Sequence, residues 1–306
     1  MAGVFVAVDR GFGPFPDPEV CTAKVNGHEV ELSLEQAENA ALISAIAVRR
    51  GLPARAASIA LATAYQESKI ENIEHGDRDS LGLFQQRPSQ GWGTEEQILD
   101  PYYSTNAFYD ALVRVDGYEK MRITEAAQKV QRSAFPEAYE DHAEDGRALA
   151  SALTGQSQGG AFTCSETGTP AKGSDELNAA GLTDRAADVR ADLAAAYGEL
   201  SLGGFSPQGI ESGHMEGSAH YAGRALDIFV RPINKANKTR GWSIAYYLVA
   251  QADRLDIATV IFDGKIWTAR RSDDGWRDYQ PDTSGRTAEQ AAILEHRDHV
   301  HVDVFP

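Results

Sequence analysis

The chain is poor in cysteine, in basic residues and in long apolar runs. None of the apolar runs among its 306 residues approaches the roughly 20 residues that a membrane-spanning helix needs, so the sequence predicts no transmembrane segment. Lysine and arginine number 29 against 45 aspartates and glutamates, and the formal net charge is −16. Because phosphates dominate affinity for nucleic acids, this charge argues against a nucleic-acid partner. A polyanionic partner would have to be recognised by local contacts.

The two cysteines, Cys21 and Cys164, both lie in loop-like sequence. A disulfide between them would close a loop of more than 100 residues, which is worth about 5 kcal/mol on the entropic model. No CxxC metal pattern is present, so we favour a disulfide and an oxidising compartment over two free thiols. The opening residues MAGVFVAV lack the cationic start of a secretory signal. The chain is therefore expected to be cytosolic or to follow a removed signal or anchor.

A segment rich in Gly, Ser and Thr divides the chain. Residues 154–176 predict a linker between a first domain at 20–153 and a second at 177–306. Apolar periodicity and capping residues predict an all-α first domain, with helices at 33–51, 53–68, 104–114 and 123–133. The second domain is expected to be α+β with a small antiparallel sheet. Its predicted elements are helices at 183–200 and 242–254, a hairpin turn at Asp263-Gly264 and a strand in the C-terminal tail.

Histidines gather in the second domain. Five of the eight lie after residue 210, and a solvated surface gives no reason for that concentration. His220 stands seven positions before Asp227, and the tail HRDHVHVDVF adds His301. Because side chains alternate along a strand, His299, His301 and Asp303 would share one face. An imidazole and a carboxylate are both good zinc ligands, so His220 and Asp227 are candidates for the ligands that the tail histidines alone do not supply.

The spacing S-x-H-x-x-G-x-A-x-D from Ser218 to Asp227 resembles the signature of the zinc D-Ala-D-Ala metallopeptidases, relatives of the lysostaphin-type enzymes and of the hedgehog signalling fold. The resemblance covers about residues 175–306. It implies that this motif and a late histidine, His301, hold zinc, and that the acid three positions earlier, Asp298, is the base. His299-x-His301 also resembles the lysostaphin-type H-x-H pair, in which the first histidine can be the base. Both candidates stay open, with Asp298 preferred.

The chemistry implied is metal-assisted peptide hydrolysis, in which zinc activates a water and polarises the peptide carbonyl. An arginine commonly positions the substrate in this family. The unranked candidates for that role are Arg224, Arg231 and Arg297. His214 and His296 are less favoured as ligands.

In the first domain, Glu67 ends an apolar helical face that includes Ile59, Thr63 and Ala64. A carboxylate in this position would be partly desolvated, which raises its pKa and makes it a general acid near neutral pH. A solvated glutamate at a helix end is the alternative.

Glu67-Ser68 and the later run SLGLFQ resemble the E-S…G-L-x-Q pattern of soluble lytic transglycosylases and goose-type lysozymes. The resemblance implies that Glu67 is the catalytic acid acting on the bond between N-acetylmuramic acid and N-acetylglucosamine. The implied substrate-binding residues are Gln85, Arg87, Trp92 and, more loosely, Tyr139. A hydrolase would also need a second carboxylate, whereas a transglycosylase would not. Asp77 and Asp79 are available but are more typical of turn residues.

Both resemblances imply the same substrate, peptidoglycan: the first domain would cut its glycan strands and the second its peptide stems. The chain resembles secreted actinobacterial two-domain cell-wall hydrolases, which implies a bifunctional peptidoglycan hydrolase that acts outside the membrane, with zinc as its cofactor. The alternatives are a wall-binding or scaffold protein with one or both sites inactive, and a protein in which the metal is structural.

Overall fold

The computed structural model describes residues 19–133, 135, 137–165, 168 and 170–306. The first eight residues lie outside this part of the chain, as do parts of the predicted linker and of the stretch before Tyr139. The elements of the first half are β1 (Val20–Val25), β2 (His28–Leu32), α1 (Leu34–Arg49), α2 (Ala54–Ser68), α3 (Glu95–Leu99), α4 (Pro101–Leu112), α5 (Ile123–Gln131) and α6 (Ala143–Leu153).

The long helices of the first half begin where their sequence signals stand. Ser33 and Gln36 form a reciprocal capping box at the start of α1, which satisfies two backbone N–H groups that the helix leaves free. Helix α2 follows Pro53, as predicted. Helix α4 begins three residues earlier than the predicted 104, because the Asp100 side chain caps the N–H of Tyr102.

A three-stranded antiparallel sheet, in the order β2-β1-β3, belongs to the first half. Its third strand, β3 (Phe162–Ser165), places Cys164 directly opposite Cys21. The two residues form the predicted disulfide, but they lie in strands rather than in loops. The prediction of an all-α first domain was therefore wrong: turn residues Asn26 and Gly27, with φ angles of 52° and 83°, connect β1 and β2.

The segment predicted to be a linker contains β3 and is tied to the second half. The N–H groups of Gly160 and Ala161 both donate to the hydroxyl of Tyr246. Trp276 donates from its indole nitrogen to the carbonyl of Phe162. Small polar residues suit a flexible tether, but they also suit a short strand between bulky partners, and composition does not distinguish the two.

The second half is α+β. Its elements are α7 (Asp184–Tyr197), β4 (Leu202–Gly203), η4 (Ala219–Ala222), β5 (Ala225–Phe229), α8 (Lys235–Ala250), β6 (Ile257–Phe262), β7 (Lys265–Thr268), β8 (Arg277–Asp278), α9 (Ala288–Leu294) and β9 (His299–Val304). Its sheet has the order β4-β5-β9-β6-β7-β8 with antiparallel neighbours. The predicted turn joins β6 to β7, with positive φ at Asp263 and Gly264. Helix α8 begins seven residues before the predicted 242, at a cap formed by Asn234.

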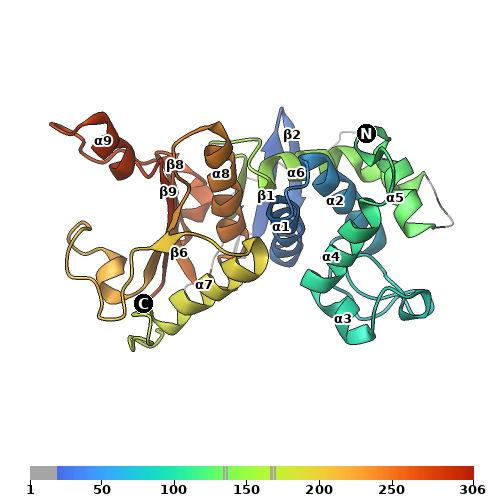
Figure 1. Ribbon diagram of the computed structural model, residues 1–306, viewed down its shortest axis with the longest axis horizontal. Coiled ribbons are helices and arrows are strands. Elements are labelled where there is room, and N and C mark those ends of the chain that lie inside the picture. The colour runs from blue at the N-terminus through green and yellow to red at the C-terminus, as the bar shows by residue number, and fades with distance from the viewer. Residues whose placement is uncertain (1–18, 134, 136, 166–167, 169) are drawn as a thin grey trace, which may run out of the picture.

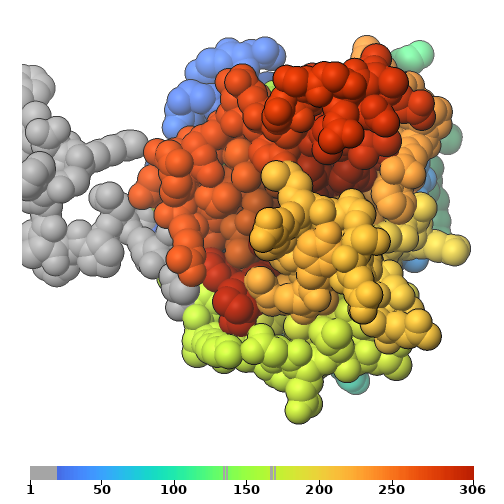
Figure 2. Space-filling model, turned by 90° about the vertical axis from the view of Figure 1, so that its left-hand side faces the viewer, coloured from blue at the N-terminus to red at the C-terminus, as the bar shows by residue number. Residues whose placement is uncertain are grey.

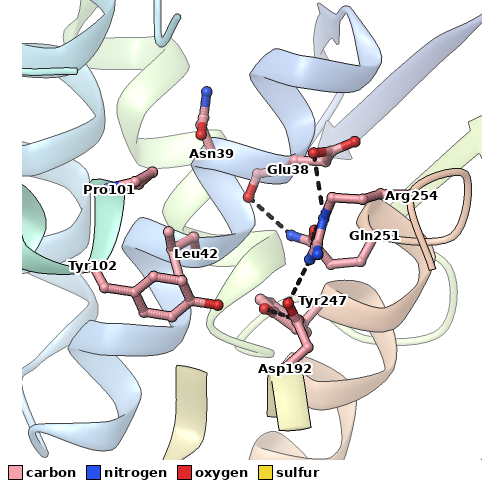
Figure 3. A pocket seen from close by; sticks show the side chains of 9 residues that line it. All are labelled: Glu38, Asn39, Leu42, Pro101, Tyr102, Asp192, Tyr247, Gln251 and Arg254. Carbon is pink, nitrogen blue, oxygen red and sulfur yellow. Dashed lines mark hydrogen bonds and ion pairs between the residues drawn. The ribbon is translucent and has the colours of Figure 1, made fainter. Parts of the chain in front are cut away.

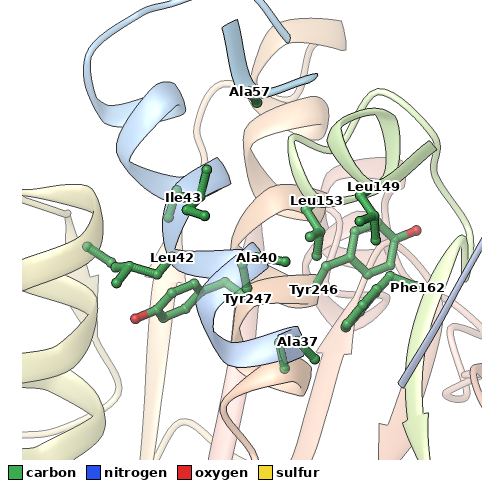
Figure 4. Packing of buried hydrophobic residues seen from close by; sticks show 14 of the residues in the cluster. Ala37, Ala40, Leu42, Ile43, Ala57, Leu149, Leu153, Phe162, Tyr246 and Tyr247 are labelled. Carbon is green, nitrogen blue, oxygen red and sulfur yellow. The ribbon is translucent and has the colours of Figure 1, made fainter. Parts of the chain in front are cut away.

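Figure 1 shows the helices of the first half on the right and the six-stranded sheet on the left, with α1 and α8 near the middle. Helix α1 packs against α8 and α7 as well as against α2. Small side chains let these helices approach closely: Ala37 and Ala40 of α1 lie beside Tyr246 and Tyr247 of α8 (Figure 4). One apolar core therefore runs through both halves. Among the described residues, no helix combines the length and apolar character needed to cross a membrane.

Candidate functional site

Three predicted ligands come together at the centre of the six-stranded sheet. Asp227 in β5 stands directly opposite His301 in β9, and His220 is supplied by the short helix η4. All three side chains are buried. The apolar alternate residues of β9 are also fully buried, so the strand presents its histidines to the cluster and its valines to the core. Alternation along the strand thus accounts for how the tail reaches the site.

The ligand atoms of the three residues are almost equidistant. Nε2 of His220 lies 3.1 Å from Nδ1 of His301 and 3.3 Å from Oδ1 of Asp227. Nδ1 of His301 lies 3.2 Å from the same carboxylate oxygen. Ligand atoms bound tetrahedrally at about 2.0–2.1 Å from a zinc ion are separated by about 3.3 Å from one another. The donor set and its spacing therefore fit such an ion.

Each of the two imidazoles uses one ring nitrogen for a hydrogen bond to a neighbouring group, which leaves its other nitrogen facing the other two ligands. Nδ1 of His220 lies 2.7 Å from the carbonyl oxygen of Gly204, so it carries the proton and leaves Nε2 as a lone pair. Nε2 of His301 lies 3.3 Å from a carboxylate oxygen of Asp303. Metal-bound histidines typically have an outer hydrogen bond of this kind. Gly204 has to be glycine, because a Cβ there would lie 2.3 Å from the His220 ring.

Two imidazole nitrogens and a carboxylate oxygen thus converge, and this arrangement suits a cation. Without a metal ion, protonation of His301 would supply that cation. Burial lowers the pKa of His301, but hydrogen bonds to Asp227 and Asp303 outweigh burial and raise the pKa to about 9. The carboxyl of Asp227 is also buried, yet its hydrogen bonds to His220 and His301 hold its pKa well below its usual range. A metal ion would replace the proton.

The two candidate bases are linked to each other. Nδ1 of His299 lies 2.7 Å from Oδ1 of Asp298, while its Nε2 lies 3.7 Å from Oδ1 of Asp227. Arg231 contacts the other oxygen of Asp298 through two nitrogens, each at 2.6 Å. Burial tends to raise the pKa of Asp298, but its contacts with His299 and Arg231 lower it. Asp298 is held on both oxygens, and the imidazole of His299 is the group that faces the ligands.

The remaining candidates of the second half take different places. Arg224 donates to the carbonyl of Val304, and Arg297 pairs with Glu295 and Asp263. Of the three arginines considered, Arg231 is therefore the one that contacts a candidate base, Asp298.

Two further histidines, His214 and His296, lie close to the cluster of His220, Asp227 and His301. The rings of His296 and His299 have centroids 4.5 Å apart, and the ring of His214 stacks on His220. Ligand atoms of His214, His220 and Asp227 all lie within 4.8 Å of one another.

Glu67, at the end of α2, opens into a cleft of about 1220 Å³ in the first half. Its Oε1 accepts hydrogen bonds from the Tyr139 hydroxyl at 2.7 Å and from Nε2 of Gln131 at 3.1 Å. Burial raises the pKa of the Glu67 carboxyl, and these two hydrogen bonds offset part of that effect. The structure thus gives Glu67 the partly desolvated setting expected of a general acid.

The predicted glycan-binding residues divide between two places. Gln85, Arg87 and Trp92 line the cleft with Glu67. Tyr139 is instead almost fully buried and donates a hydrogen bond to the carboxyl of Glu67 from the protein interior. Gln131 was not predicted, and it bridges Glu67 to the carbonyl of Phe84.

The two nearby aspartates differ. Asp79 accepts from Arg87 at 2.7 Å and from the backbone of Ser89 at 2.8 Å, as a turn-forming residue does. Asp77 lines the cleft, and its side chain is 94% exposed. Only Asp77 of the pair is therefore available to the cleft.

A smaller pocket of about 200 Å³ lies where α1 and α4 meet α7 and the end of α8. Figure 3 shows Arg254 between Glu38 and Asp192, with the nearest nitrogen–oxygen distances at 3.6 Å and 2.6 Å. Tyr247 donates to the other oxygen of Asp192 at 2.5 Å. These pairs connect the two halves of the chain and are distant in sequence from both candidate sites.

Comparison with known proteins finds a match that lies within the second half. A family model described as the VldE C-terminal domain matches residues 178–291. The matched segment is similar to that family and includes His214, His220 and Asp227, but it ends before Asp298 and the histidines of β9. None of the curated proteins compared with the chain matches it.

Proposed function

We propose that the chain is a bifunctional peptidoglycan hydrolase that acts outside the cell membrane, with a zinc peptidase site in residues 177–306 and a glycan-cleaving site in residues 20–153. One observation carries the proposal: the lone pairs of His220 and His301 meet the Asp227 carboxylate at separations of 3.1–3.3 Å. The resemblance of the S-x-H-x-x-G-x-A-x-D motif to zinc peptidases supports the same site. The disulfide supports an oxidising compartment.

In the peptidase site, His220, Asp227 and His301 would hold the ion. A bound zinc would supply an activated water and a Lewis acid for the peptide carbonyl. His299 then acts as the general base, because its Nε2 faces the ligands while Asp298 holds Nδ1. Asp298 orients the ring and stabilises its protonated form, and Arg231 fixes Asp298. The structure thus favours His299 over Asp298 as the base, the reverse of the preference drawn from the sequence.

In the glycan site, Glu67 gives its proton to the glycosidic oxygen. Tyr139 and Gln131 both bind Oε1, so Oε2 is the oxygen left to deliver the proton into the cleft. Among the cleft-lining aspartates, Asp110 is paired with Arg50 at 2.6 Å, and Asp77 is highly exposed. A single desolvated acid suits a lytic transglycosylase, in which the 6-hydroxyl of the sugar closes on the anomeric carbon. We therefore infer this outcome over hydrolysis.

Digestion of purified peptidoglycan with the zinc-loaded full chain tests both activities. Mass spectrometry of the fragments should find 1,6-anhydro ends from the glycan site and new amino termini from the peptidase site. Glu67→Gln should remove only the anhydro ends. His220→Ala should remove only the new amino termini and reduce the zinc content below one ion per chain. Intact polymer after incubation with the wild-type protein would instead support a wall-binding or scaffold role.

A further inference from the structure

A loop lies over the metal ligands of the second half. Residues 204–218 connect β4 to η4, and His214 in this loop stacks on His220, with ring centroids 3.9 Å apart and an angle of 27° between the planes. The loop, in yellow, and α9 with its flanking residues, in red, are both on the face shown in Figure 2. The proposed mechanism gives His214 no role, although one of its ring nitrogens lies within 4.8 Å of a ligand atom of His220 and of Asp227.

A tyrosine holds His214 in this position. The hydroxyl of Tyr221 donates to the carbonyl oxygen of His214 at 2.6 Å and accepts from its N–H at 3.1 Å. Tyr221 follows His220 in η4, so the clamp ties the loop to the turn that supplies a ligand. On either side of His214, Gly213 and Gly217 have φ angles of 97° and 77°. No atom lies within 4 Å of a Cβ built at either glycine, so the flanking backbone has room to move.

We propose that His214 is a fourth, displaceable ligand that closes the metal site in its resting state. This inference rests on the proposed zinc site, because it needs an ion held by His220, Asp227 and His301. Bound ligand atoms lie about 3.3 Å apart, so the imidazole of His214 has to leave its stack on His220 and turn a nitrogen toward the ion to join the other three. Four protein ligands make a closed site, and three leave the position that a hydrolytic site needs. A peptide substrate would open the site by displacing His214.

His299 also lies close enough to close the site, but it is held differently. Its ring is on β9, between two paired strands, and its Nδ1 is bound to Asp298 at 2.7 Å. His214 is anchored through its backbone by one tyrosine hydroxyl. Displacing His214 therefore requires movement of the loop that this clamp holds, besides replacement of its bond to the ion, whereas displacing His299 would disturb the sheet.

Cobalt substitution of the full chain tests the proposal, because a closed four-coordinate site absorbs visible light far more strongly than a site with added water. The His214→Ala variant should keep one ion per chain, absorb more weakly and release the ion about 10- to 100-fold more readily, the scale expected for losing a group that supports a metal. Tyr221→Phe should fall between this variant and the wild type. Met215→Ala, at an exposed neighbour, is the matched control and should behave as the wild type.

Acetohydroxamate, a small bidentate metal ligand, separates a displaceable ligand from a permanent one. By linkage, the His214→Ala variant should bind this probe tighter than the wild type by the factor that displacing His214 costs, about tenfold or more. A wild-type cobalt site that never binds the probe would make His214 a structural ligand and overturn the proposal. An unchanged spectrum and unchanged ion release in His214→Ala would also overturn it while leaving the three-ligand site intact. A wild-type chain that binds no ion would refute the zinc site and this inference together.

Discussion

Asp298 binds Nδ1 of His299 at 2.7 Å and thereby turns the other ring nitrogen toward Asp227, 3.7 Å away. The pair resembles a base and its orienting carboxylate rather than two rival bases. A carboxylate that is hydrogen-bonded on both oxygens is a poor proton acceptor, whereas an imidazole with a free Nε2 is well placed to accept one. In the proposed mechanism the two residues therefore have different roles, and variants at the two positions should behave differently.

We expect His299→Ala to retain zinc and to lose peptide cleavage by about 10²- to 10⁴-fold, the usual contribution of a general base. Added imidazole should restore part of the activity of this variant, because the small base can occupy the vacated space. Asp298→Ala should also be slow, but imidazole should not rescue it, since its own ring is still present. Rescue of Asp298→Ala by formate together with an active His299→Ala variant would return the role of base to Asp298.

Glu67→Gln should reduce glycan cleavage by about 10²- to 10⁴-fold and leave peptide cleavage unchanged. Glutamine keeps the size of the side chain and an oxygen that can accept from Tyr139, so the cleft should remain intact. The measurement is the release of reducing and anhydro ends from peptidoglycan. Asp77→Asn is the matched test for a second carboxylate. If Asp77→Asn is as inactive as Glu67→Gln, the reaction is a hydrolysis that needs both acids.

Tyr139→Phe should shift the alkaline limb of the pH–rate profile for glycan cleavage to higher pH. Burial raises the pKa of Glu67, and the Tyr139 hydroxyl opposes this rise by stabilising the ionised carboxylate. Removing the hydroxyl leaves the desolvation effect less opposed, so the acid keeps its proton to higher pH. Tyr109→Phe is the control, because Tyr109 is equally buried and donates to the carbonyl of Ile43. A profile that moves alike in both variants would indicate a general loss of packing.

Glu38→Gln should remove part of the pH dependence of stability. Burial is the largest cause that raises the pKa of Glu38 from 4.5 to about 6, against the opposing charge of Arg254. Because the folded-state pKa is the higher one, the contribution of this group is fully present below about pH 4.5 and is lost as the pH rises through about 6. The loss corresponds to about 2 kcal/mol.

Urea unfolding of the wild type and of Glu38→Gln at several pH values measures this effect. The free energy of unfolding of the variant, relative to the wild type, should rise by about 2 kcal/mol between pH 4 and pH 7. Other titrating groups cancel in the difference between the two proteins. A difference that does not change with pH would show that Glu38 has the same affinity for its proton in the folded and unfolded chain.

Local signals predicted much of this fold, because the residues that decide them are neighbours in the sequence. Ser33 and Gln36 cap α1, Pro53 precedes α2, and Asp263 with Gly264 forms the hairpin turn. Asn26-Gly27 is an equally strong hairpin signal, and it joins β1 to β2. The expectation of an all-α first domain did not take it into account. Strand β3 has no such signal: four residues of modest apolar character become a strand only because β1 lies beside them.

The candidate sites divide in the same way. His220, Asp227 and His301 could be predicted, because motif spacing and strand alternation are both visible in a sequence. The hydrogen bond between Asp298 and His299 could not be predicted, because neighbouring side chains within a strand point to opposite faces. The two side chains meet because Asp298 lies just before β9, which begins at His299. Gln131 and Glu67 are 64 positions apart in the sequence, and a short sequence motif does not predict a contact between residues so far apart.

Helix α1 belongs to the interior of both halves, and the strand next to it is covalently fastened to β3 through Cys21 and Cys164. A cut in the Gly- and Ser-rich segment before Cys164 would leave the two pieces joined by the disulfide. A cut after Cys164 would expose the apolar surface that α1 shares with α7 and α8, so neither half is expected to be stable as a separate fragment. The cleft beside Glu67 and the cluster of His220, Asp227 and His301 therefore keep a fixed orientation to each other. A polymer that is cleaved at both places, as proposed, would have to adapt to that orientation.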